Sequence, residues 1–483
     1  MPITSFRFAN IVVVANDFEA RYGTPYTPYE HFAPWNVNDD GLPVPEGTLT
    51  VDGEKATGLD LLLNGLFNVE RFGQLLTDFT AFDNKPSGFV IRIAKPHQYF
   101  AVTKAVASTV TAMNGDKRAG VVWHTTGAGK SMEMEMYTAK IMRHPSMASP
   151  TVIVLNDRTE LDQQLYDTFS VSELLPEAPT QIRSREELRE QLSTRTSGGI
   201  YFSTLQKFGL SGVGEEREEE HPLLSDRRNI VVVVDEAHRS HYGFGDTADG
   251  YAQHLRDALP NATMLAFTGT PLKKWDRDTR KVFGDDIDIY DMNRAVKDGA
   301  VVPVYFEPRL LPLARIPGVT DDDIDAAAEE ALEGLDELER DRIQRSVAVL
   351  ELIYGTDDRL DRLAADLVGH WEDRRENMKE FIGGHGKALV VTATRSIAAR
   401  LYSKIVALRP EWHNDADDKG KIKVIYSANP SDPEEIKKHM RRPSALAAVK
   451  ARVKNVEDEL EIAIVQGMML TGFDAKALHT LYI

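Results

Sequence analysis

The chain has 483 residues, of which 42% are hydrophobic and 27% are charged, and its formal net charge is −18. This composition is ordinary for a globular protein, and the length predicts about three domains. No apolar run approaches the ~20 residues of a membrane span, residues 1–20 do not resemble a signal peptide, and the absence of cysteine excludes disulfides and thiolate metal sites and fits a cytoplasmic protein.

The negative charge restricts how the chain could hold nucleic acid. A protein that binds DNA by itself usually has a basic surface, so positive charge would have to gather in a groove here or come from partner subunits. Much of the acid is local, because residues 321–339 are rich in Asp and Glu and contain no basic residue. We interpret that run as a solvated helix face rather than an interaction tail.

The predicted elements begin with a loop-rich segment. Residues 1–50 are rich in Pro, Gly and Asn and carry turn signals. Residues 58–82 have apolar side chains at helical spacing and predict a helix. Residues 322–354 show the pattern of an amphipathic helix as well.

From about residue 96, short apolar runs alternate with helix-like stretches. The predicted strands are Gly120–Trp123, Thr151–Leu155, Gly199–Phe202, Ile230–Val234 and Met264–Phe267, then a second set at Ala388–Val391, Ile422–Ile425, Ile462–Val465 and Leu478–Ile483. Near-continuous apolar strands that alternate with helices predict a parallel sheet with helices on both faces. The predicted fold class is therefore α/β.

A glycine-bearing loop follows the first of these strands, within Trp123–Ser131. Backbone N–H groups of such a loop can surround phosphate oxygens, and the helix that follows presents its positive end. Lys130 would neutralise the β- and γ-phosphates of ATP, and Ser131 would ligate Mg²⁺. The usual pattern G-x-x-x-x-G-K-[ST] is not fully met, because His124 stands at the first glycine.

Two carboxylates, Asp235 and Glu236, follow the apolar run Val231–Val234. The run could be only a central strand with a polar end, but ligands of open α/β sheets bind at that edge. Asp235 would hold the same Mg²⁺, and Glu236 would orient or deprotonate the attacking water. Together with the loop, these residues predict an ATP-hydrolysing motor.

Several motifs, in this order, resemble the motor of type I restriction endonuclease R subunits. They are Leu63–Phe67, Pro96–Val102, Trp123–Met132, Asn156–Gln164, Thr204–Phe208, Asp235–Ser240, Phe267–Pro271, Val390–Arg395 and Met468–Asp474. A histidine at the position of His124 is usual in that family. The resemblance covers nearly the whole chain.

The resemblance implies a helicase superfamily-two motor that pumps duplex DNA with ATP and Mg²⁺, in a complex with a methyltransferase subunit and a specificity subunit. It also implies two RecA-like domains, the second of them incomplete. We expect residues 1–95 to lead into the motor and residues 96–300 to form its first domain. Residues 301–483 would form the second domain, with an acidic helical insertion at about 320–380.

The resemblance also implies roles for single residues in nucleotide binding. Gln98 would hydrogen-bond the adenine, the alternative being a solvent-facing helix residue. The phosphates and Mg²⁺ would be held by Thr125, Gly127, Gly129, Lys130 and Ser131. The residues that close over nucleotide and DNA from the second domain would be Thr471, Gly472 and Asp474.

Further residues would act on DNA by the same resemblance. Nucleotide state would be coupled to DNA contact by Thr268, Gly269 and Thr270, although Gly-Thr-Pro is also good turn chemistry. The DNA backbone would be gripped without base readout by Arg158, Thr204, Gln206 and Lys207 and, on the second domain, by Thr392, Thr394 and Arg395. Each of these could also be an ordinary surface residue.

Two features of the family are missing from the sequence. The expected nuclease site, an Asp with a Glu-x-Lys pair, has only the candidate Asp52–Lys55, which lies in a turn-rich stretch, so no nuclease site is predicted. An arginine that reaches the γ-phosphate from the second domain is also not found, because neither Arg395 nor Arg400 sits in such a motif. We therefore expect a fragment with an unfinished second sheet.

Three functions follow from these observations. The first is the ATP-dependent motor of a type I restriction enzyme. The second is a remnant that binds nucleotide and DNA without turnover, which the missing arginine favours and the intact Lys130, Asp235 and Glu236 oppose. The third is a free-standing helicase, which the context of Leu66–Phe67 and His97–Tyr99 opposes.

Overall fold

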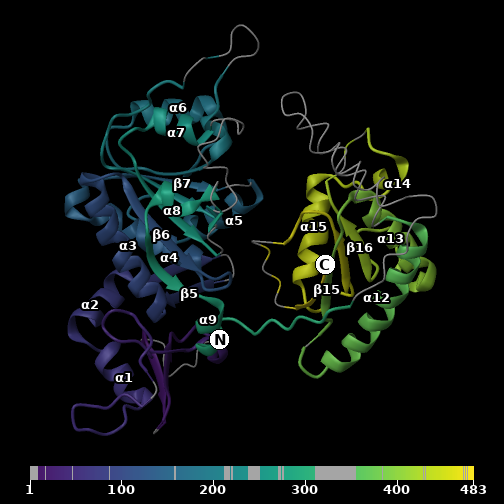
Figure 1. Cartoon of the computed structure of the whole chain (residues 1–483), viewed down its shortest axis with the longest axis horizontal. Helices are drawn as coiled ribbons and strands as arrows, with labels where there is room; N and C mark the ends of the chain where they lie inside the picture. The colour runs from purple at the N-terminus through teal and green to yellow at the C-terminus, as the bar shows by residue number, and fades with distance from the viewer. Residues whose placement is uncertain are drawn as a thin grey trace. The chain divides into compact units, whose positions relative to one another are not determined.

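The computed structural model describes residues 9–16, 18–45, 47–85, 88–156, 159–211, 218, 221–237, 251–269, 273–274, 277–309, 355–382, 384–427, 429, 431–470, 473, 475 and 477–483. The chain divides into two compact units, Met1–Tyr305 and Phe306–Ile483, drawn in purple to teal and in green to yellow in Figure 1. The acidic run at 321–339 and the predicted helix at 322–354 lie outside the described residues.

The first unit begins with a small sheet where the sequence predicted mainly loops. Its strands are β1 (Val12–Ala15), β2 (Ala20–Gly23) and β3 (Ala33–Pro34), which pair antiparallel. A short 3-10 helix, η2 (Tyr29–His31), precedes β3.

The single helix predicted at 58–82 is wrong. The structure has α1 (Gly58–Gly65), α2 (Val69–Asp78) and then a hairpin of β4 (Thr80–Lys85) and β5 (Gly88–Ile93). The break has a local cause, because the Asn68 side chain accepts a hydrogen bond from the backbone N–H of Arg71 and so starts a new helix. Phe82 belongs to the hairpin rather than to the helical face.

A seven-stranded parallel sheet forms the centre of the first unit, in the order β14-β6-β11-β10-β7-β9-β8. Its strands are β6 (Arg118–His124), β7 (Thr151–Asn156), β8 (Thr180–Gln181), β9 (Ile200–Thr204), β10 (Ile230–Asp235), β11 (Thr263–Thr268) and β14 (Asp286–Tyr290). Every neighbouring pair is parallel. The predicted α/β class is confirmed.

Helices cover both faces of this sheet (Figure 1). One face carries α3 (Pro96–Asn114), α4 (Lys130–Arg143) and α5 (Thr159–Ser170), and the other carries α6 (Arg185–Thr194), α7 (Tyr251–Ala258) and α8 (Thr279–Phe283). Within β10, Val231 and Val233 pack into the first layer, and Val232 and Val234 pack into the second. This alternation is the two-residue period of a strand buried on both faces.

Smaller elements complete the first unit. They are η3 (Pro145–Met147), η4 (Leu205–Phe208), α9 (Met292–Lys297) and a two-stranded ribbon of β12 (Lys273–Lys274) and β13 (Arg277–Asp278). Among them, α9 follows the edge strand β14 directly. That position matters for the site, because the chain after β14 packs beside the glycine loop.

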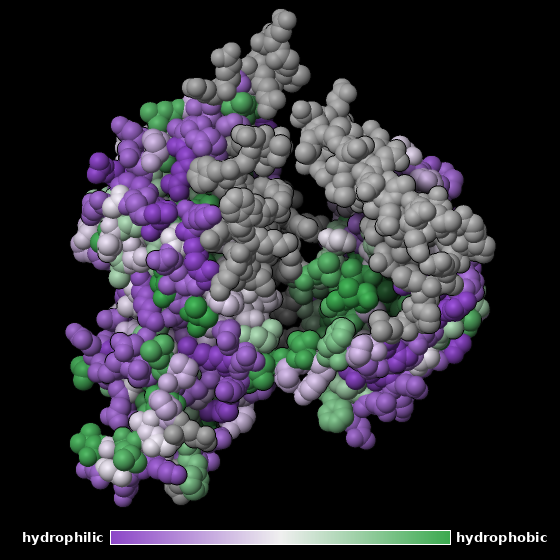
Figure 2. Space-filling model, viewed as in Figure 1, coloured by the Kyte–Doolittle hydropathy of each residue, from purple (hydrophilic) through white to green (hydrophobic). Residues whose placement is uncertain are grey.

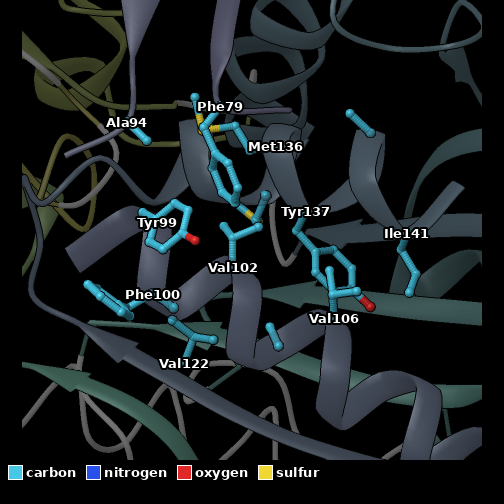
Figure 3. Close-up of a cluster of buried hydrophobic side chains, with 14 of the residues drawn as sticks. Phe79, Ala94, Tyr99, Phe100, Val102, Val106, Val122, Met136, Tyr137 and Ile141 are labelled. Atoms are coloured by element: carbon cyan, nitrogen blue, oxygen red, sulfur yellow. The ribbon is translucent and has the colours of Figure 1, made fainter. Parts of the chain in front are cut away.

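The core between the N-terminal helices and the sheet is rich in aromatic side chains (Figure 3). Phe79 is fully buried, and its ring centroid lies 4.8 Å from that of Tyr99 on α3. The ammonium of Lys140 on α4 lies 5.2 Å above the Phe79 ring. Phe79 therefore packs the end of α2 against α3 and α4, the two helices beside the glycine loop.

We expect Phe79→Ala to lower the unfolding free energy of the first unit by about 3–5 kcal/mol, because it empties a fully buried aromatic site. Denaturant unfolding followed by circular dichroism would measure the loss. Phe18→Ala is the control, since that side chain is 81% exposed. Equal unfolding midpoints for the two variants would contradict this packing.

The second unit also holds a parallel sheet, in the order β16-β17-β15-β18. Its strands are β15 (Lys387–Val391), β16 (Ile422–Ile425), β17 (Ile462–Val465) and β18 (Leu478–Tyr482). Its helices are α12 (Asp357–Met378), α13 (Arg395–Leu408), η6 (Pro410–Trp412), α14 (Glu434–Lys437) and α15 (Pro443–Lys454). The first two pack around the buried Trp371 on one face, and α15 packs on the other.

Hydrophobic surface is visible on this second unit over α15 and the C-terminal strand (Figure 2). Leu481 and Ile483 at the strand end are 49% and 97% exposed.

In the part of the chain that the structure describes, no helix combines the length and the apolar character needed to cross a bilayer.

Candidate nucleotide site

The carboxyl ends of three neighbouring strands bring the predicted catalytic residues together. In the first unit β11 lies between β6 and β10. The glycine loop follows β6, Asp235 ends β10, and Thr268 ends β11. Since these strands are parallel, their ends share one edge of the sheet, which is where open α/β sheets bind ligands.

Two glycines shape the loop between β6 and α4. Gly127 and Gly129 have φ values of +88° and +94°, a left-handed conformation that disfavours any residue with a side chain. Gly129 is the N-cap of α4, so the unpaired N–H groups of the first helical turn begin at Lys130. Ser131 in that turn is exposed. This is the geometry of an anion site at a helix N-terminus.

Hydrogen bonds from α3 and β14 hold the loop from behind. The N–H of Thr125 donates to the carbonyl of Tyr290 over 2.9 Å. The carbonyl of Ala128 accepts from Gln98 Nε2 at 3.3 Å and lies 3.0 Å from His97 Nε2. The N–H of Gly129 belongs to the same peptide group as the Ala128 carbonyl. Because α3 binds that carbonyl, the Gly129 N–H points to the opposite side of the loop.

Gln98 is buried beneath the glycine loop and does not face solvent. It is only 3% exposed, so a solvent-facing position is wrong. Its Oε1 accepts from the N–H of Lys95 at 2.9 Å, and its Nε2 also donates to the carbonyl of Gly129 at 3.4 Å. Gln98 thus caps α3 and supports the glycine loop, while its contact with adenine stays a prediction.

Lys130 and the two acids form a charged cluster beside the loop. Lys130 Nζ donates to the carbonyl of His124 at 3.3 Å and lies 3.8 Å from Oε1 of Glu236. The N–H of Glu236 donates to Oδ1 of Asp235 at 2.9 Å. Glu236 has a φ of +49°, which is rare for a residue with a side chain and is found at functional sites.

Gly269 lies so near the loop that a side chain at this position would collide with it. A Cβ atom at this position would lie 2.9 Å from Oγ1 of Thr126 and 3.3 Å from Nζ of Lys130. Its carbonyl accepts from Nε1 of Trp123 at 3.1 Å, and the preceding Thr268 is fully buried. The predicted coupling segment therefore reaches the glycine loop through Gly269, while Thr270 lies outside the described residues.

His124 belongs to a buried cluster of charges that motif reasoning did not find. Its Nδ1 lies 2.8 Å from Oε1 of Glu133, and its Nε2 lies 3.0 Å from Oδ2 of Asp288. Burial by itself lowers the pKa of His124, but the two carboxylates outweigh it and raise the pKa to about 9. The carboxylates at both ring nitrogens thus favour the doubly protonated, charged form of His124.

The same cluster has the spacing of a metal site, because ligand atoms of His97, His124 and Glu133 lie within 4.8 Å of one another. Both ring nitrogens of His124 already lie at hydrogen-bond distance from carboxylates. A metal ligand needs a ring nitrogen without a proton, so the arrangement fits an ion pair network instead. The available sequence signal was two acids that alternate with methionines in α4, Glu133 and Glu135, and both are buried.

The residues of the first unit that were predicted to bind the DNA backbone differ in how exposed they are to solvent. Thr204 is buried at the end of β9, Gln206 is exposed on η4, and Lys207 is half-buried. The ammonium of Lys207 donates to the carbonyl of Ile182. Arg158 lies outside the described residues. Their contact with DNA stays a prediction.

In the second unit, the predicted DNA residues order the start of α13. Thr392 Oγ1 donates to the carbonyls of Thr394 and Val465 at 3.0 and 3.1 Å, and Thr394 Oγ1 caps the helix by accepting from the N–H of Ile397. Arg395 makes a bidentate pair with Asp432 at 2.6 and 3.1 Å. Thr471, Gly472 and Asp474 lie outside the described residues.

The nuclease-site candidate Asp52–Lys55 and the arginine candidate Arg400 both lie at the protein surface. Asp52–Lys55 is an exposed turn in which the N–H of Gly53 donates to the carbonyl of Thr50 at 3.0 Å, so its acids do not lie at a buried strand end. Arg400 pairs with Asp357 at 3.2 Å on the surface of the second unit.

Comparisons with known proteins were made on sequence and on fold. Residues 97–341 match the family model of the SWI2/SNF2 ATPase, and residues 444–483 match that of type I restriction enzyme subunit R domain 3. The chain is 38% identical to the type I restriction enzyme HindI endonuclease subunit of Haemophilus influenzae, over 99% of this chain and 44% of that protein.

A second relative comes from an archaeon. The chain is 37% identical to the putative type I restriction enzyme MjaIXP endonuclease subunit of Methanocaldococcus jannaschii, again over 99% of this chain and 44% of that protein. The chain therefore spans less than half the length of these two relatives.

Solved structures resemble the chain more distantly. The ATP-dependent type ISP restriction-modification enzyme LlaBIII bound to DNA has a TM-score of 0.44 at 14% identity, over 82% of this chain and 26% of that chain. The Pyrococcus furiosus Hef helicase domain has a TM-score of 0.36 at 14% identity, over 78% and 88%. At these scores the likeness adds nothing to the strand order given above.

Proposed function

This chain belongs to the SWI2/SNF2 ATPase family and is homologous to endonuclease subunits of type I restriction enzymes, and we propose that it is the ATP-dependent DNA-translocating part of such a subunit. The observation that carries the proposal is the meeting of Lys130, Glu236 and Gly269 at the glycine loop. A phosphate-binding lysine, a water-activating acid and a coupling segment are the parts that an ATP-driven motor needs.

ATP would bind with its phosphates on the loop. The N–H groups around Gly127 and Gly129 and the start of α4 would receive the phosphate oxygens, and Lys130 would move from Glu236 to the β- and γ-phosphates. The oxygens of Ser131 and Asp235 are the ligand type that Mg²⁺ prefers. A bound Mg²⁺ would offset the charge that develops on the phosphates.

Glu236 would act on water. Its carboxylate lies in the charged cluster and is 14% exposed, so a water molecule can reach it. When the phosphates draw Lys130 away, the Glu236 carboxylate would orient that water and accept its proton. Its strained backbone supports this role, because such strain persists only where surrounding contacts maintain it.

The nucleotide site would be coupled to DNA movement through the end of β11 and through the second motor domain. A side chain at Gly269 would meet Thr126 and Lys130 of the loop, and the Gly269 carbonyl accepts from Trp123 just before the loop, so a shift of the loop would displace the end of β11. We propose residues 96–300 and 301–483 as the two motor domains, with Gly472 and Asp474 closing over nucleotide from the second. The capped N-terminus of α13 beside Thr394 and Arg395 would bind a DNA phosphate, as Thr204, Gln206, Lys207 and Arg158 would on the first domain.

The partners would be duplex DNA and the methyltransferase and specificity subunits of a type I restriction complex in the cytoplasm. The net charge of −18 supports the need for partners, since DNA binding depends mainly on contacts of positive charge with phosphate. The names of the relatives describe endonuclease subunits. We place no nuclease site in this chain.

A remnant that binds nucleotide without turnover remains the second candidate. The observation in its favour is that Arg395 and Arg400 are engaged by Asp432 and Asp357. Neither arginine is therefore offered to a γ-phosphate in the described arrangement of the second unit.

The test is ATP hydrolysis by this chain with and without duplex DNA, using Lys130→Ala as the blank. We expect turnover above the blank that duplex DNA stimulates. Binding of ATP that depends on Lys130, without turnover, would support the remnant instead. Stimulation by single-stranded RNA rather than duplex DNA would favour a free-standing helicase, and the absence of any ATP binding would contradict all three functions.

A further inference from the structure

We propose that His124 is a positioning residue for nucleotide binding, whose ring ties the two ends of the glycine loop to each other and to the edge strand β14. This inference rests on the proposed function, since it concerns the same loop. It gives a physical role to the residue that replaces the first glycine of the usual pattern.

His124 stands at the junction of β6 and the glycine loop. It is the last residue of β6, and the loop begins immediately after it. Its Nδ1 bonds Glu133, which lies in the first turn of α4 just beyond the loop. One side chain therefore bridges the residue before the loop and the helical turn after it. Such a bridge limits how far the two ends can separate.

The edge strand β14 holds the other nitrogen of the His124 ring. His124 Nε2 bonds Asp288 of β14, and Asp288 also accepts from Nζ of Lys104 on α3 at 2.6 Å. Two residues further along the same strand, the carbonyl of Tyr290 accepts the N–H of Thr125. The start of the loop is thus held to β14 both by a side chain and by the backbone.

A third contact extends the support to the top of the loop. The ring of Tyr290 stacks on His97 with centroids 3.9 Å apart and an interplanar angle of 10°. His97 Nε2 lies 3.0 Å from the carbonyl of Ala128. Burial, followed by the nearby charge of His124, holds the pKa of His97 well below its usual value, so neutral His97 can donate to that carbonyl.

The charges in the cluster explain why a cation is needed at position 124. Glu133 is fully buried, and its Oε2 has no hydrogen-bond partner among the described residues. Without the imidazolium, the buried carboxylates of Glu133 and Asp288 would lose the cation between them, and Lys104 would offset the charge of Asp288 but not that of Glu133. The loop would lose its bridge, and uncompensated negative charge would lie behind a site for phosphates.

The position of Lys130 depends on the same residue. The carbonyl of His124 accepts from Nζ of Lys130. A shift of the His124 backbone would therefore displace the cation that meets the phosphates. A residue that served only to stabilise the fold would not have this specific consequence for nucleotide affinity.

The test is ATP binding and steady-state ATP hydrolysis by His124→Gln, in the whole chain and with folding checked by circular dichroism. Glutamine keeps a polar side chain but no charge. We expect the dissociation constant and KM for ATP to rise about tenfold or more, with a smaller change in kcat. Adding Asp288→Asn removes one of the two facing charges and is expected to recover at least about a third of the lost affinity on a logarithmic scale.

Arg280→Met provides the matched control. Arg280 pairs with Asp286, at the opposite end of β14 and about 13 Å along the strand from Tyr290. Its loss should lower stability while leaving ATP affinity within about twofold. An equal loss of affinity in this variant would mean general destabilisation and would overturn the inference, as would unchanged ATP affinity in folded His124→Gln.

Two further outcomes separate this inference from the function on which it rests. If His124→Gln does not fold, Glu133→Met removes the oxygen that His124 bonds, with a side chain of similar length. This variant is expected to weaken ATP binding about tenfold; unchanged affinity there overturns the inference. If ATP binding does not depend on Lys130, the proposed function fails and takes the inference with it. If binding depends on Lys130 but not on His124 or Glu133, only the inference fails.

Discussion

Lys130→Ala is expected to abolish ATP hydrolysis, with a loss of about 100-fold or more, the scale of removing one preorganised group from a developing charge. Lys130 is the cation at the start of α4, and it lies between the carbonyl of His124 and Glu236. Alanine leaves no positive charge at this position for the β- and γ-phosphates, and it also removes the ion pair between Lys130 and Glu236. Equilibrium binding of ATP and a turnover assay would measure the two effects separately.

The matched control for this variant is Lys140→Ala on the same helix. It removes the same charge about 15 Å along α4, where Lys140 pairs with Asp78. The control should keep nucleotide affinity although it loses an ion pair. Unchanged ATP affinity in Lys130→Ala would overturn the assignment of the loop as a phosphate site.

Glu236→Gln is expected to keep ATP binding and to lose turnover by about 100- to 10,000-fold, the range for removal of a general base. The amide has the size of the carboxylate but cannot accept a proton from water. Binding should be kept or slightly strengthened, because the loop and Lys130 remain and one negative charge near the phosphates is gone. Single-turnover measurements with ATP bound in advance would isolate the chemical step.

Glu190→Gln is the control for this change, since Glu190 is an exposed acid on α6. It should behave as the unchanged chain in both binding and turnover. Persistence of turnover in Glu236→Gln would mean that Glu236 does not activate the water. Asp235 would then be the next residue to test at that strand end.

The sequence predicted the parallel strands well, because each is a local run of apolar residues that must be buried on both faces. Val231–Val234 illustrates this, since alternate residues enter different layers of the core. The helix at 58–82 failed for an equally local reason. A cap at Asn68 and the hairpin pairing of Thr80–Lys85 compete with helical spacing, and pairing partners are not visible in a helical pattern.

In the candidate site, the residues that depend on local motifs were found, and those that depend on long-range contact were not. The glycine loop and the acids after β10 are motifs that a reader can recognise without coordinates. Asp288 was not found, because nothing near it in the chain marks it as a partner of His124. His124 and Asp288 are hydrogen-bonded although they lie 164 positions apart in the sequence.

The α/β class, the glycine loop and the acids that follow β10 could all be predicted without the structure, because apolar runs and short motifs are local in the chain. The burial of Gln98 against the loop and the position of His124 between Glu133 and Asp288 depend on contacts that the folded chain makes. The physical reason is that a buried charge must find its counter-charge wherever the fold brings one near. Chain order does not reveal which strand edge or helix end supplies it.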